Sequence, residues 1–243
     1  PAGQSVTRPS VAAAASARRM GADKTAPRRA LSSAGTIRRA KPRMSSPTRT
    51  VHHGDALDWL DRHVAHAGCS FFTSLPDVSE LAPLSLDDWR RWFVSAARRV
   101  LAATPDDGVA IFYQTDIKVD RRWIDKGYLV QRAAEETGHA LLWHKIVCRH
   151  PAGTVTHGRP GYAHLLCFSR DVVPDLGRST ADVLPDLGAM TWSRAMGLEA
   201  ARVAVRFVRT HTQSHTLVDP FCGVGTALAV ANAEGLHALG VEL

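Results

Sequence analysis

The chain has 243 residues, 45% of them hydrophobic, and a formal net charge of +7. It contains no run of 18 or more apolar residues, which argues against a transmembrane helix. Its four cysteines include no CxxC pair, which favours a reduced intracellular protein over a disulfide-stabilised secreted one. We therefore expect a cytoplasmic protein without membrane contact.

The positive charge is concentrated at the start of the sequence. Residues 1–50 contain 11 Lys or Arg and one acidic residue, Asp23, whereas residues 51–243 contain 19 Lys or Arg and 22 acidic residues. The first 50 residues are rich in Ala, Arg, Ser and Pro, a composition that cannot bury enough apolar surface to fold. We therefore predict a basic, disordered extension at 1–50 and one folded domain at 51–243.

Three interpretations of the extension are open. An Arg- and Ser-rich, acid-poor segment is typical of an organelle-targeting leader, which would occupy residues 1–43. The same composition suits a basic arm that binds nucleic acid. The third interpretation is that residues 1–43 do not belong to the natural protein, because Met44 stands just before the first expected strand.

From about residue 51, strand and helix patterns alternate, which is typical of a mainly parallel sheet with helices on both faces. Ser85 is the expected N-cap of the second helix, ahead of two aspartates. Residues 170–190 are predicted to form a loop. The expected strands are 48–54, 69–74, 108–116, 139–150, 161–170, 215–219 and 237–243, and the expected helices lie within 55–68, 84–104, 121–138, 193–212 and 225–235.

The segment "HTLVDPFCGVGTALAVANA", residues 215–233, predicts a strand, a tight turn and a helix. Gly223 and Gly225 allow the backbone to approach a ligand, and the helix start offers unpaired N–H groups. Glu242, at the end of the following strand, is positioned to bind both hydroxyls of a ribose. A dinucleotide fingerprint would have a third glycine where Leu228 stands, and a bare GxG is also compatible with a purely structural turn.

The stretch "DPFCGVGT" resembles the cofactor motif DPF-x-G-x-G-T of amino-methyltransferases that use S-adenosylmethionine. "HALGVEL" resembles that family's ribose-binding strand, and "HGDAL", residues 53–57, resembles its adenine-contacting segment. The resemblance implies S-adenosylmethionine as the cofactor and no metal ion. It also implies that the cofactor is bound by Asp219, Pro220, Phe221, Gly223, Gly225, Thr226, Glu242 and Asp55.

The resemblance also implies a fold. It is an α/β, doubly wound, mainly parallel sheet of seven strands, the Rossmann-like methyltransferase fold, in a circularly permuted motif order. In the permuted group of this family the chain enters at the adenine-contacting strand and reaches the cofactor turn last, as it does here. The resemblance covers most of residues 51–243.

The catalytic half of the resemblance is divergent. "FFTSLPD", residues 71–77, lies where the family has S/D/N-P-P-aromatic, so the implied catalytic residues are Ser74, Leu75, Pro76 and Asp77. Three explanations remain open. The enzyme methylates an unusual acceptor with Asp77 as polar contact or base. Alternatively it methylates an ordinary base amine, with stacking from Phe112, Tyr113 or Trp143. Otherwise it binds the cofactor without turnover.

Other polar groups have competing interpretations. Histidines and cysteines in 144–167 match no standard zinc spacing, so we expect no metal there. Gln114 and Asp116 end a strand and are candidates for the pocket or for capping. The stretch 144–161 gathers Lys145, Arg149, His150, His157 and Arg159 around a loop, which suits phosphate or substrate binding and a solvated hairpin tip equally. For the aromatics in "RRWIDKGYLV", residues 121–130, we favour core positions over nucleic-acid contacts.

The expected function is therefore methyl transfer from S-adenosylmethionine to a nucleic-acid base, with DNA and RNA both open as the partner. The alternative from another class is a catalytically inactive protein that binds the cofactor or nucleic acid. An NAD-dependent oxidoreductase could use the same turn, but the missing third glycine and the "DPF" segment argue against it.

Overall fold

The computed structural model describes residues 46–63, 67–81, 83–192 and 195–243. The chain divides into two compact units, 1–43 and 44–243, and every described residue lies in the second. Nearly all of the expected extension, residues 1–50, is thus outside the described residues. Strand β1 begins at Arg49, two residues before the expected start of the domain. No helix of the described part is long and apolar enough to cross a membrane.

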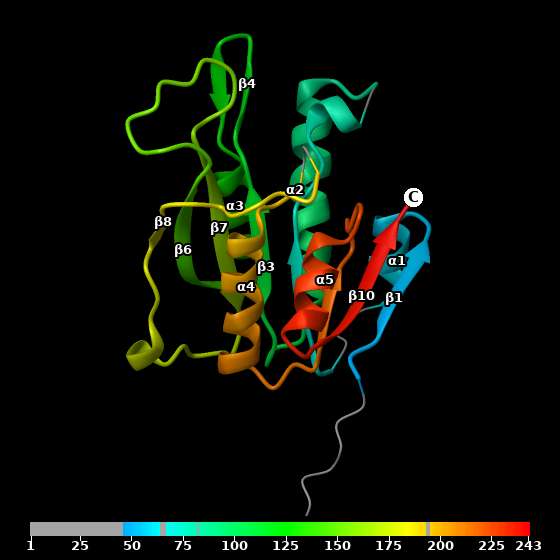
Figure 1. Ribbon diagram of the computed structural model, residues 1–243. Helices are drawn as coiled ribbons and strands as arrows, with labels where there is room; N and C mark the ends of the chain where they lie inside the picture. Colours follow the sequence, from blue (N-terminus) through cyan, green and yellow to red (C-terminus); the bar gives the residue numbers. More distant parts are fainter. Residues whose placement is uncertain (1–45, 64–66, 82, 193–194) are drawn as a thin grey trace, which may run out of the picture. The chain divides into compact units, whose positions relative to one another are not determined.

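The described residues form one eight-stranded sheet whose five adjacent strands β1, β10, β9, β2 and β3 are parallel (Figure 1). Strand β7 pairs antiparallel with β3 and β6, and β8 pairs parallel with β6. In spatial order the strands are β1 (Arg49–His53), β10 (His237–Glu242), β9 (Thr216–Asp219), β2 (Cys69–Thr73), β3 (Ala110–Gln114), β7 (Tyr162–Ser169), β6 (Ala140–Cys148) and β8 (Val183–Leu184).

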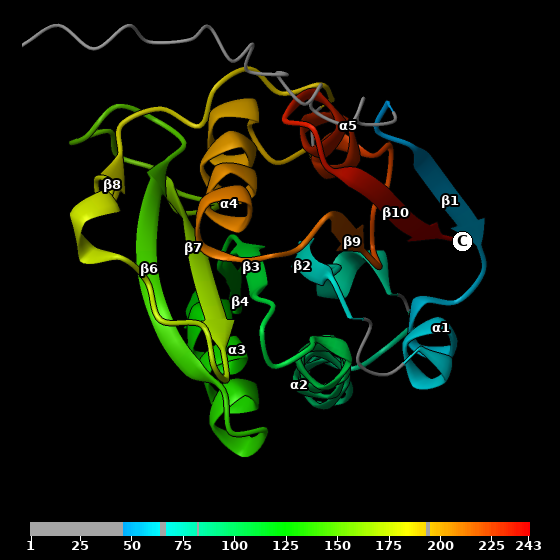
Figure 2. The ribbon, with the colours of Figure 1, turned by 90° about the horizontal axis from the view of Figure 1, so that it is seen from below.

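Helices cover both faces of this sheet, as the alternating pattern predicted (Figure 2). One face packs against α1 (Ala56–Arg62), α2 (Leu86–Ala103) and α3 (Lys126–Glu136). The other packs against α4 (Leu198–His211) and α5 (Thr226–Ala233). Strands β2 and β3 are buried along their whole length, which explains why their sequences are continuous apolar runs rather than alternating ones.

Local signals set the helix boundaries. The Ser85 hydroxyl accepts a hydrogen bond from the Asp88 backbone N–H at 3.1 Å, so the expected N-cap of α2 is confirmed. Trp89, Phe93 and Val100 on its apolar stripe are fully buried. Capping and burial together fix α2 against the sheet, where its Trp89 contacts Pro76.

The predicted number of strands is wrong. The sheet of the described residues has eight strands rather than seven, because Val183 and Leu184, in the expected loop 170–190, pair with β6 at its edge. The helix expected within 121–138 is present as α3 (Lys126–Glu136), and it is preceded by a hairpin that the sequence did not predict, β4 (Ile117–Val119) and β5 (Arg122–Ile124). Short 3-10 turns, η1 (Val78–Glu80) and η2 (Leu176–Arg178), complete the elements.

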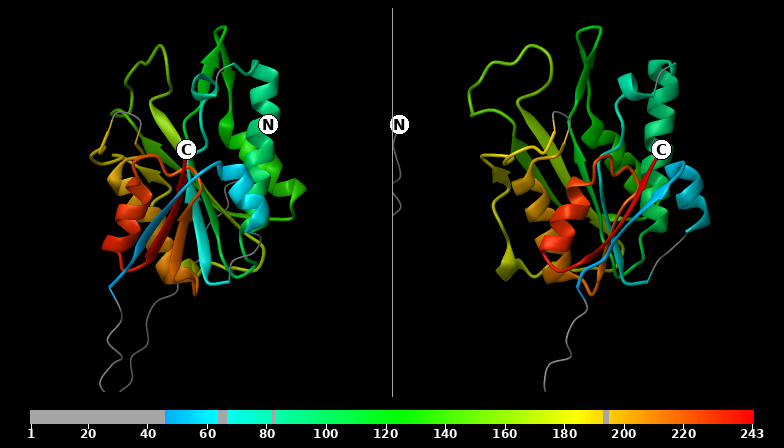
Figure 3. Two further views of the ribbon diagram at one scale, coloured as in Figure 1. Left: turned by 90° about the vertical axis from the view of Figure 1, so that its right-hand side faces the viewer. Right: turned by 45° about the vertical axis from the view of Figure 1, so that its right-hand side comes forward.

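The first and last strands of the domain are neighbours in space. Strand β10 lies between β1 and β9 and is parallel to both (Figure 3). Its pairing aligns His53 with Glu242 and Asp219 with Gly240. The segments after β1 and β9 and the end of β10 therefore meet at one edge of the sheet.

Candidate functional site

A chain of hydrogen bonds links the expected cofactor and catalytic segments along the carboxyl edge of the parallel strands. The Gly54 N–H donates to the Glu242 carbonyl at 2.9 Å, and the Gly223 N–H donates to the Glu242 carboxylate at 2.7 Å. On the next pair of strands, the Thr73 hydroxyl donates to the Asp219 carboxylate at 2.7 Å. Residues from β1, β10, β9 and β2 are thus brought together in the crevice where open α/β sheets bind ligands.

The glycine turn has the backbone geometry that its sequence predicted. Gly223 and Gly225 have φ values of 50° and 81°, in the left-handed region where a side chain is disfavoured. The Gly225 N–H donates to the Cys222 carbonyl at 2.8 Å, and Gly225 is the N-cap residue of α5. The turn is tied to β10 by the Cys222 N–H, which donates to the Val241 carbonyl at 3.1 Å. Gly223 is exposed and Gly225 is buried.

A dinucleotide fingerprint would have a glycine at position 228, where this chain has Leu228. The close approach between helix and strand is instead allowed by Gly240 on β10. A Cβ built on Gly240 would lie 2.7 Å from both Cys222 Sγ and Leu228 Cδ1. Gly240 therefore lets β10 approach the turn and the first part of α5 closely. Leu228 fills the space that a small residue on the helix would leave.

Asp219 ends β9 with its carboxylate buried at 1% exposure. Burial raises the pKa of Asp219 to about 7, although hydrogen bonds from Thr73 and from the Phe221 N–H oppose the shift, and the negative charge of Glu242 adds to it. A carboxylate in this position favours a cationic partner, because a positive charge would offset the cost of desolvation.

The remaining expected cofactor residues lie around the same turn. Pro220 is buried, and Phe221 packs edge-on against Trp92 with ring centroids 6.0 Å apart. The Thr226 hydroxyl is 2.8 Å from that of Thr191, which ties the turn to the segment before α4. Asp55 is the N-cap of α1: one of its oxygens accepts hydrogen bonds from the N–H groups of Leu57 and Asp58.

Residues 74–77, the expected catalytic segment, connect the end of β2 to η1. Leu75 and Asp77 are buried, and the Pro76 carbonyl accepts a hydrogen bond from the Trp89 indole at 3.2 Å. Both oxygens of Asp77 are used. Lys126 Nζ donates to Oδ1 at 2.5 Å, and Arg159 Nη2 donates to Oδ2 at 2.6 Å. Asp77 is therefore an anchor for two cations, which leaves little room for proton abstraction by this carboxylate.

The Lys126 contact has no signal in the sequence, because the "DK" at 125–126 marks only a helix start. Lys126 is 3% exposed, and burial lowers its pKa against the opposing effect of Asp77. Breaking such a pair by removing one partner is costly because a buried charge is left behind. The pair therefore holds α3 to the catalytic segment.

A cavity of about 560 Å³ opens beside Asp77. Its walls come from the catalytic segment, from the β4–β5 hairpin and from the loop between β6 and β7. None of the aromatic residues considered for stacking on a base lines it: Phe112 packs on Phe168, Trp143 packs on Phe207, and Tyr113 is buried in the core on the α4 side. The cavity is instead lined by Lys118, Arg121, His157 and Arg159.

The aromatics of the hairpin and of α3 are not in the core, so the favoured interpretation of residues 121–130 is wrong for them. Trp123, in β5, is 50% exposed, and Tyr128, in the first turn of α3, is 57% exposed. The two aromatics therefore lie on different elements, a short strand and a helix, and do not share one helix face.

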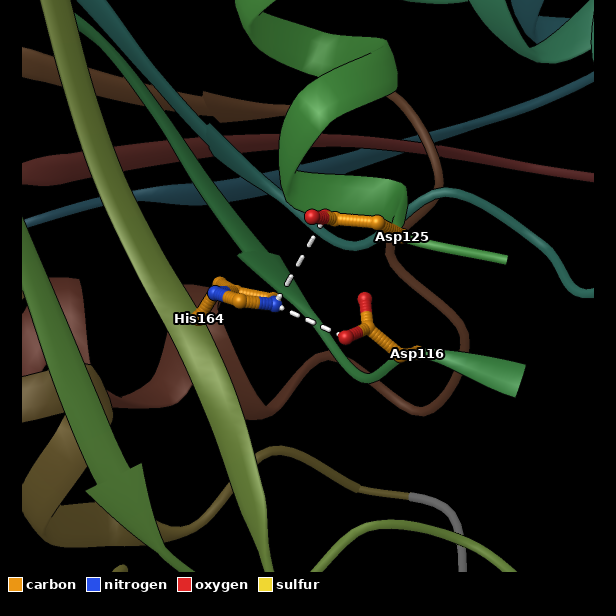
Figure 4. A group of neighbouring side chains, drawn as sticks. All are labelled: Asp116, Asp125 and His164. Carbon is orange, nitrogen blue, oxygen red and sulfur yellow. Dashed lines mark hydrogen bonds and ion pairs between the residues drawn. The ribbon is translucent and has the colours of Figure 1, made fainter. Parts of the chain in front are cut away.

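A separate polar cluster joins β3, α3 and the β6–β7 hairpin (Figure 4). His164 Nε2 lies 3.1 Å from Asp116 Oδ2 and 3.9 Å from Asp125 Oδ1, and its Nδ1 lies 2.9 Å from His144 Nε2. Burial alone would raise the pKa of Asp116, but the hydrogen bond and charge of His164 bring it below its usual value. Burial and the neighbouring His164 lower the pKa of His144.

Asp116, Asp125 and His164 are the described residues that could together hold a metal ion, whereas the cysteines of this region do not join them. The hydrogen bonds among these groups account for their closeness without an ion. Gln114 is fully buried and its amide has no hydrogen-bond partner within the described part of the chain. Asp116 instead accepts a hydrogen bond from the Lys126 N–H, which connects this cluster to Asp77 through one residue.

No protein-family model and no curated protein matches the sequence. Solved structures share the fold. A candidate DNA modification methylase from Thermus thermophilus is 21% identical with a TM-score of 0.62, over 81% of this chain and 89% of that chain. The same protein in complex with S-adenosylmethionine has a TM-score of 0.60.

Two further structures extend the comparison. The PvuII DNA methyltransferase, described as cytosine-N4-specific, is 15% identical with a TM-score of 0.62, over 82% of this chain and 83% of that chain. The complex of M1.HpyAVI with S-adenosylmethionine is 12% identical with a TM-score of 0.55, over 80% of this chain and 93% of that chain. At these identities the similarity shows the fold: a mixed α/β domain with a mostly parallel sheet, as in DNA methyltransferases.

Proposed function

We propose that this protein is an S-adenosylmethionine-dependent methyltransferase that modifies a base in nucleic acid, with DNA as the first substrate to test. One observation carries the proposal. At the carboxyl edge of the sheet, Glu242 accepts a hydrogen bond from the left-handed Gly223 turn with its carboxylate and another from Gly54, the residue before Asp55, with its backbone carbonyl. Structures with this fold include complexes with S-adenosylmethionine, which adds support.

The residues at this edge fit the chemistry of the cofactor. Asp219 supplies a buried carboxylate for a cationic group, and Glu242 keeps acceptor capacity for a ribose diol beside the exposed Gly223. Asp55 keeps one oxygen that does not cap α1, which we assign to the adenine. Pro220, Phe221 and Thr226 shape the turn. When bound, the cofactor supplies an already activated methyl group.

The catalytic segment then acts by orientation. We propose that Ser74 and the Leu75 carbonyl accept hydrogen bonds from the acceptor amine and thereby point its lone pair at the methyl group. Pro76 holds the segment rigid through its contact with Trp89. Asp77, bound to Lys126 and Arg159, fixes the wall of the cavity and is not the base.

We also propose that the chain follows the permuted motif order of the amino-methyltransferases. The strand before the glycine turn, β9, and the ribose strand, β10, are the last in the sequence, yet they lie between β1 and β2 in the sheet. A chain that enters at the adenine-contacting strand produces this arrangement.

Calorimetry with S-adenosylmethionine and, separately, with NAD tests the cofactor assignment. We expect binding of the former alone. Glu242→Gln should weaken it roughly tenfold or more, since a hydrogen bond to a charged group contributes about 1.5–3 kcal/mol. Glu135→Gln, at an exposed acid on α3, is the matched control and should bind like the wild type. Binding of NAD alone would replace this proposal with an oxidoreductase.

Transfer of a tritium-labelled methyl group to total DNA and total RNA separates an enzyme from an inactive cofactor-binding protein. Incorporation should be reduced but not abolished by Asp77→Asn, because asparagine keeps one carbonyl acceptor and loses the second oxygen and the charge that bind Lys126 and Arg159. No incorporation into either nucleic acid, with cofactor binding intact, would favour the inactive alternative.

A further inference from the structure

The tip of the β4–β5 hairpin carries an arginine in an unfavourable backbone conformation. Val119 pairs with Arg122, so Asp120 and Arg121 form a two-residue turn, and their φ values are 49° and 63°. Positive φ at both positions is the type I′ geometry, for which glycine and asparagine are preferred. An arginine there costs conformational energy that a glycine would avoid, and such residues cluster at binding sites.

The hairpin also presents cations without acidic partners. Among the described residues, Lys118 and Arg121 form no ion pair with a carboxylate, although Asp120 adds one negative charge at the tip. Lys118 Nζ lies 4.3 Å from the centre of the Trp123 ring, which is half exposed. Lys118 and Arg121 both line the 560 Å³ cavity.

The opposite wall adds a third cation. Arg159 comes from the loop between β6 and β7, which rises beside the hairpin at the same end of the sheet (Figure 1). Asp77 is the one acidic side chain that lines the cavity in the described part of the chain, and two cations share its charge: buried Lys126 at 2.5 Å and Arg159 itself at 2.6 Å. The cavity entrance is therefore positively charged, although residues 51–243 carry more acidic than basic side chains.

We propose that the hairpin, residues 117–124, is a nucleic-acid contact: Lys118 and Arg121 bind backbone phosphates of the strand whose base enters the cavity, and Arg159 binds them from the facing loop. Arg121 keeps its strained conformation for this contact. That the bound polymer is a nucleic-acid strand with a base in the cavity rests on the proposed function. The phosphate-binding role of the three named residues can be tested by binding without turnover.

The substitution Arg121→Gly separates a binding role from a structural one. Glycine suits the left-handed turn, so we expect a higher unfolding temperature than in the wild type. We also expect weaker binding of fluorescent oligonucleotides. The slope of log affinity against log salt should fall in magnitude by about 0.7 for single strands and about 0.9 for duplexes, the value for one lost phosphate contact.

Controls and a second variant make the result decisive. Arg98→Ala removes the same charge from the α2 surface, 54% exposed and away from the cavity, and should leave the slope unchanged. Lys118→Ala should lower the slope like Arg121→Gly. Matched DNA and RNA oligonucleotides, single-stranded and duplex, distinguish which polymer supplies the phosphates.

Unchanged affinity and slope in Arg121→Gly and Lys118→Ala, with S-adenosylmethionine binding intact by calorimetry, would overturn the inference and leave the proposed function standing. Failure of the wild type to bind any oligonucleotide would overturn it too. If the slopes fall as expected but the protein binds no S-adenosylmethionine, the phosphate contact is supported and the proposed enzyme fails.

Discussion

Asp219 shows how one buried carboxyl group can couple stability to pH. Burial raises the pKa of Asp219 from an ordinary value of 3.8 to about 7. A group whose pKa is raised in the folded state stabilises the fold fully below its unfolded pKa, and this contribution is lost as the pH rises through the folded pKa. The window for Asp219 therefore runs from about pH 4 to pH 7, and above it the domain carries an unfavourable buried charge.

Asp219→Asn should remove this pH dependence. An asparagine can accept the same hydrogen bonds from Thr73 and the Phe221 N–H without a charge. We expect near-equal stability of the two proteins at pH 4, and a variant more stable than the wild type by roughly 2–4 kcal/mol at pH 8. Urea unfolding at both pH values measures the difference, with exposed Asp107→Asn as the control. Parallel pH profiles for wild type and variant would show that folding does not raise the pKa of Asp219.

At the scale of elements, the cofactor turn depends on close packing between α5 and β10. Gly240 on β10 faces Cys222 and Leu228, and a Cβ would lie 3.1 Å from Cys222 Cβ as well as 2.7 Å from the two side-chain ends. Leu228 Cδ1 can move aside, whereas Cys222 Cβ belongs to the turn itself. A methyl group at Gly240 therefore pushes the turn away from the strand.

Gly240→Ala should destabilise the fold by about 1–3 kcal/mol through overpacking. Adding Leu228→Val shortens one of the two contacting side chains, so the double variant should regain part of the loss, with a coupling of about 0.5–3 kcal/mol. Gly161→Ala is the control, since its Cβ would meet Thr156 only at an ordinary 3.8 Å. Chemical unfolding of Gly240→Ala, Leu228→Val, the double variant and Gly161→Ala measures the coupling. Strictly additive losses would mean that the extra methyl group at position 240 does not press on Leu228.

The elements also show what the sequence can predict. The glycine turn could be predicted because left-handed backbone demands glycine, and its spacing to Glu242 follows from one helix and one strand. The β4–β5 hairpin could not, because its turn residues, Asp120 and Arg121, are not the glycine or asparagine that mark a type I′ turn. The two-residue strand β8 was missed because so short an edge strand has no periodicity.

For the whole domain, ion pairs between residues far apart in the chain could not be predicted from the sequence. Asp77 binds Lys126, 49 residues away, and Arg159, 82 residues away. No local sequence pattern connects these three charges. The sequence therefore shows that "SLPD" has an aspartate where the resembled motif has an aromatic residue, but it does not show what the aspartate binds. In the structure, Asp77 joins the end of β2 to α3 through Lys126 and to one wall of the cavity through Arg159.

The proposed cofactor would stabilise the domain as a whole, because its site is built from several strands. A ligand that contacts the ends of β1, β10, β9 and β2 at once is lost completely on unfolding, so its binding energy adds to the free energy of unfolding. At a concentration about 100 times its Kd the gain is about 2.7 kcal/mol. For a domain of this size, that corresponds to a rise in Tm of roughly 5–10 °C.

We therefore expect S-adenosylmethionine to raise the Tm in thermal unfolding followed by circular dichroism, and NAD at the same concentration to leave it unchanged. Glu242→Gln should reduce the rise, because it weakens binding at the edge shared by the strands. Arg121→Gly should keep the full rise from its own, higher starting Tm, since the hairpin lies on the acceptor side of the cavity. A rise lost in Arg121→Gly but kept in Glu242→Gln would mean that the cofactor occupies the cavity beside Asp77 instead of the glycine turn.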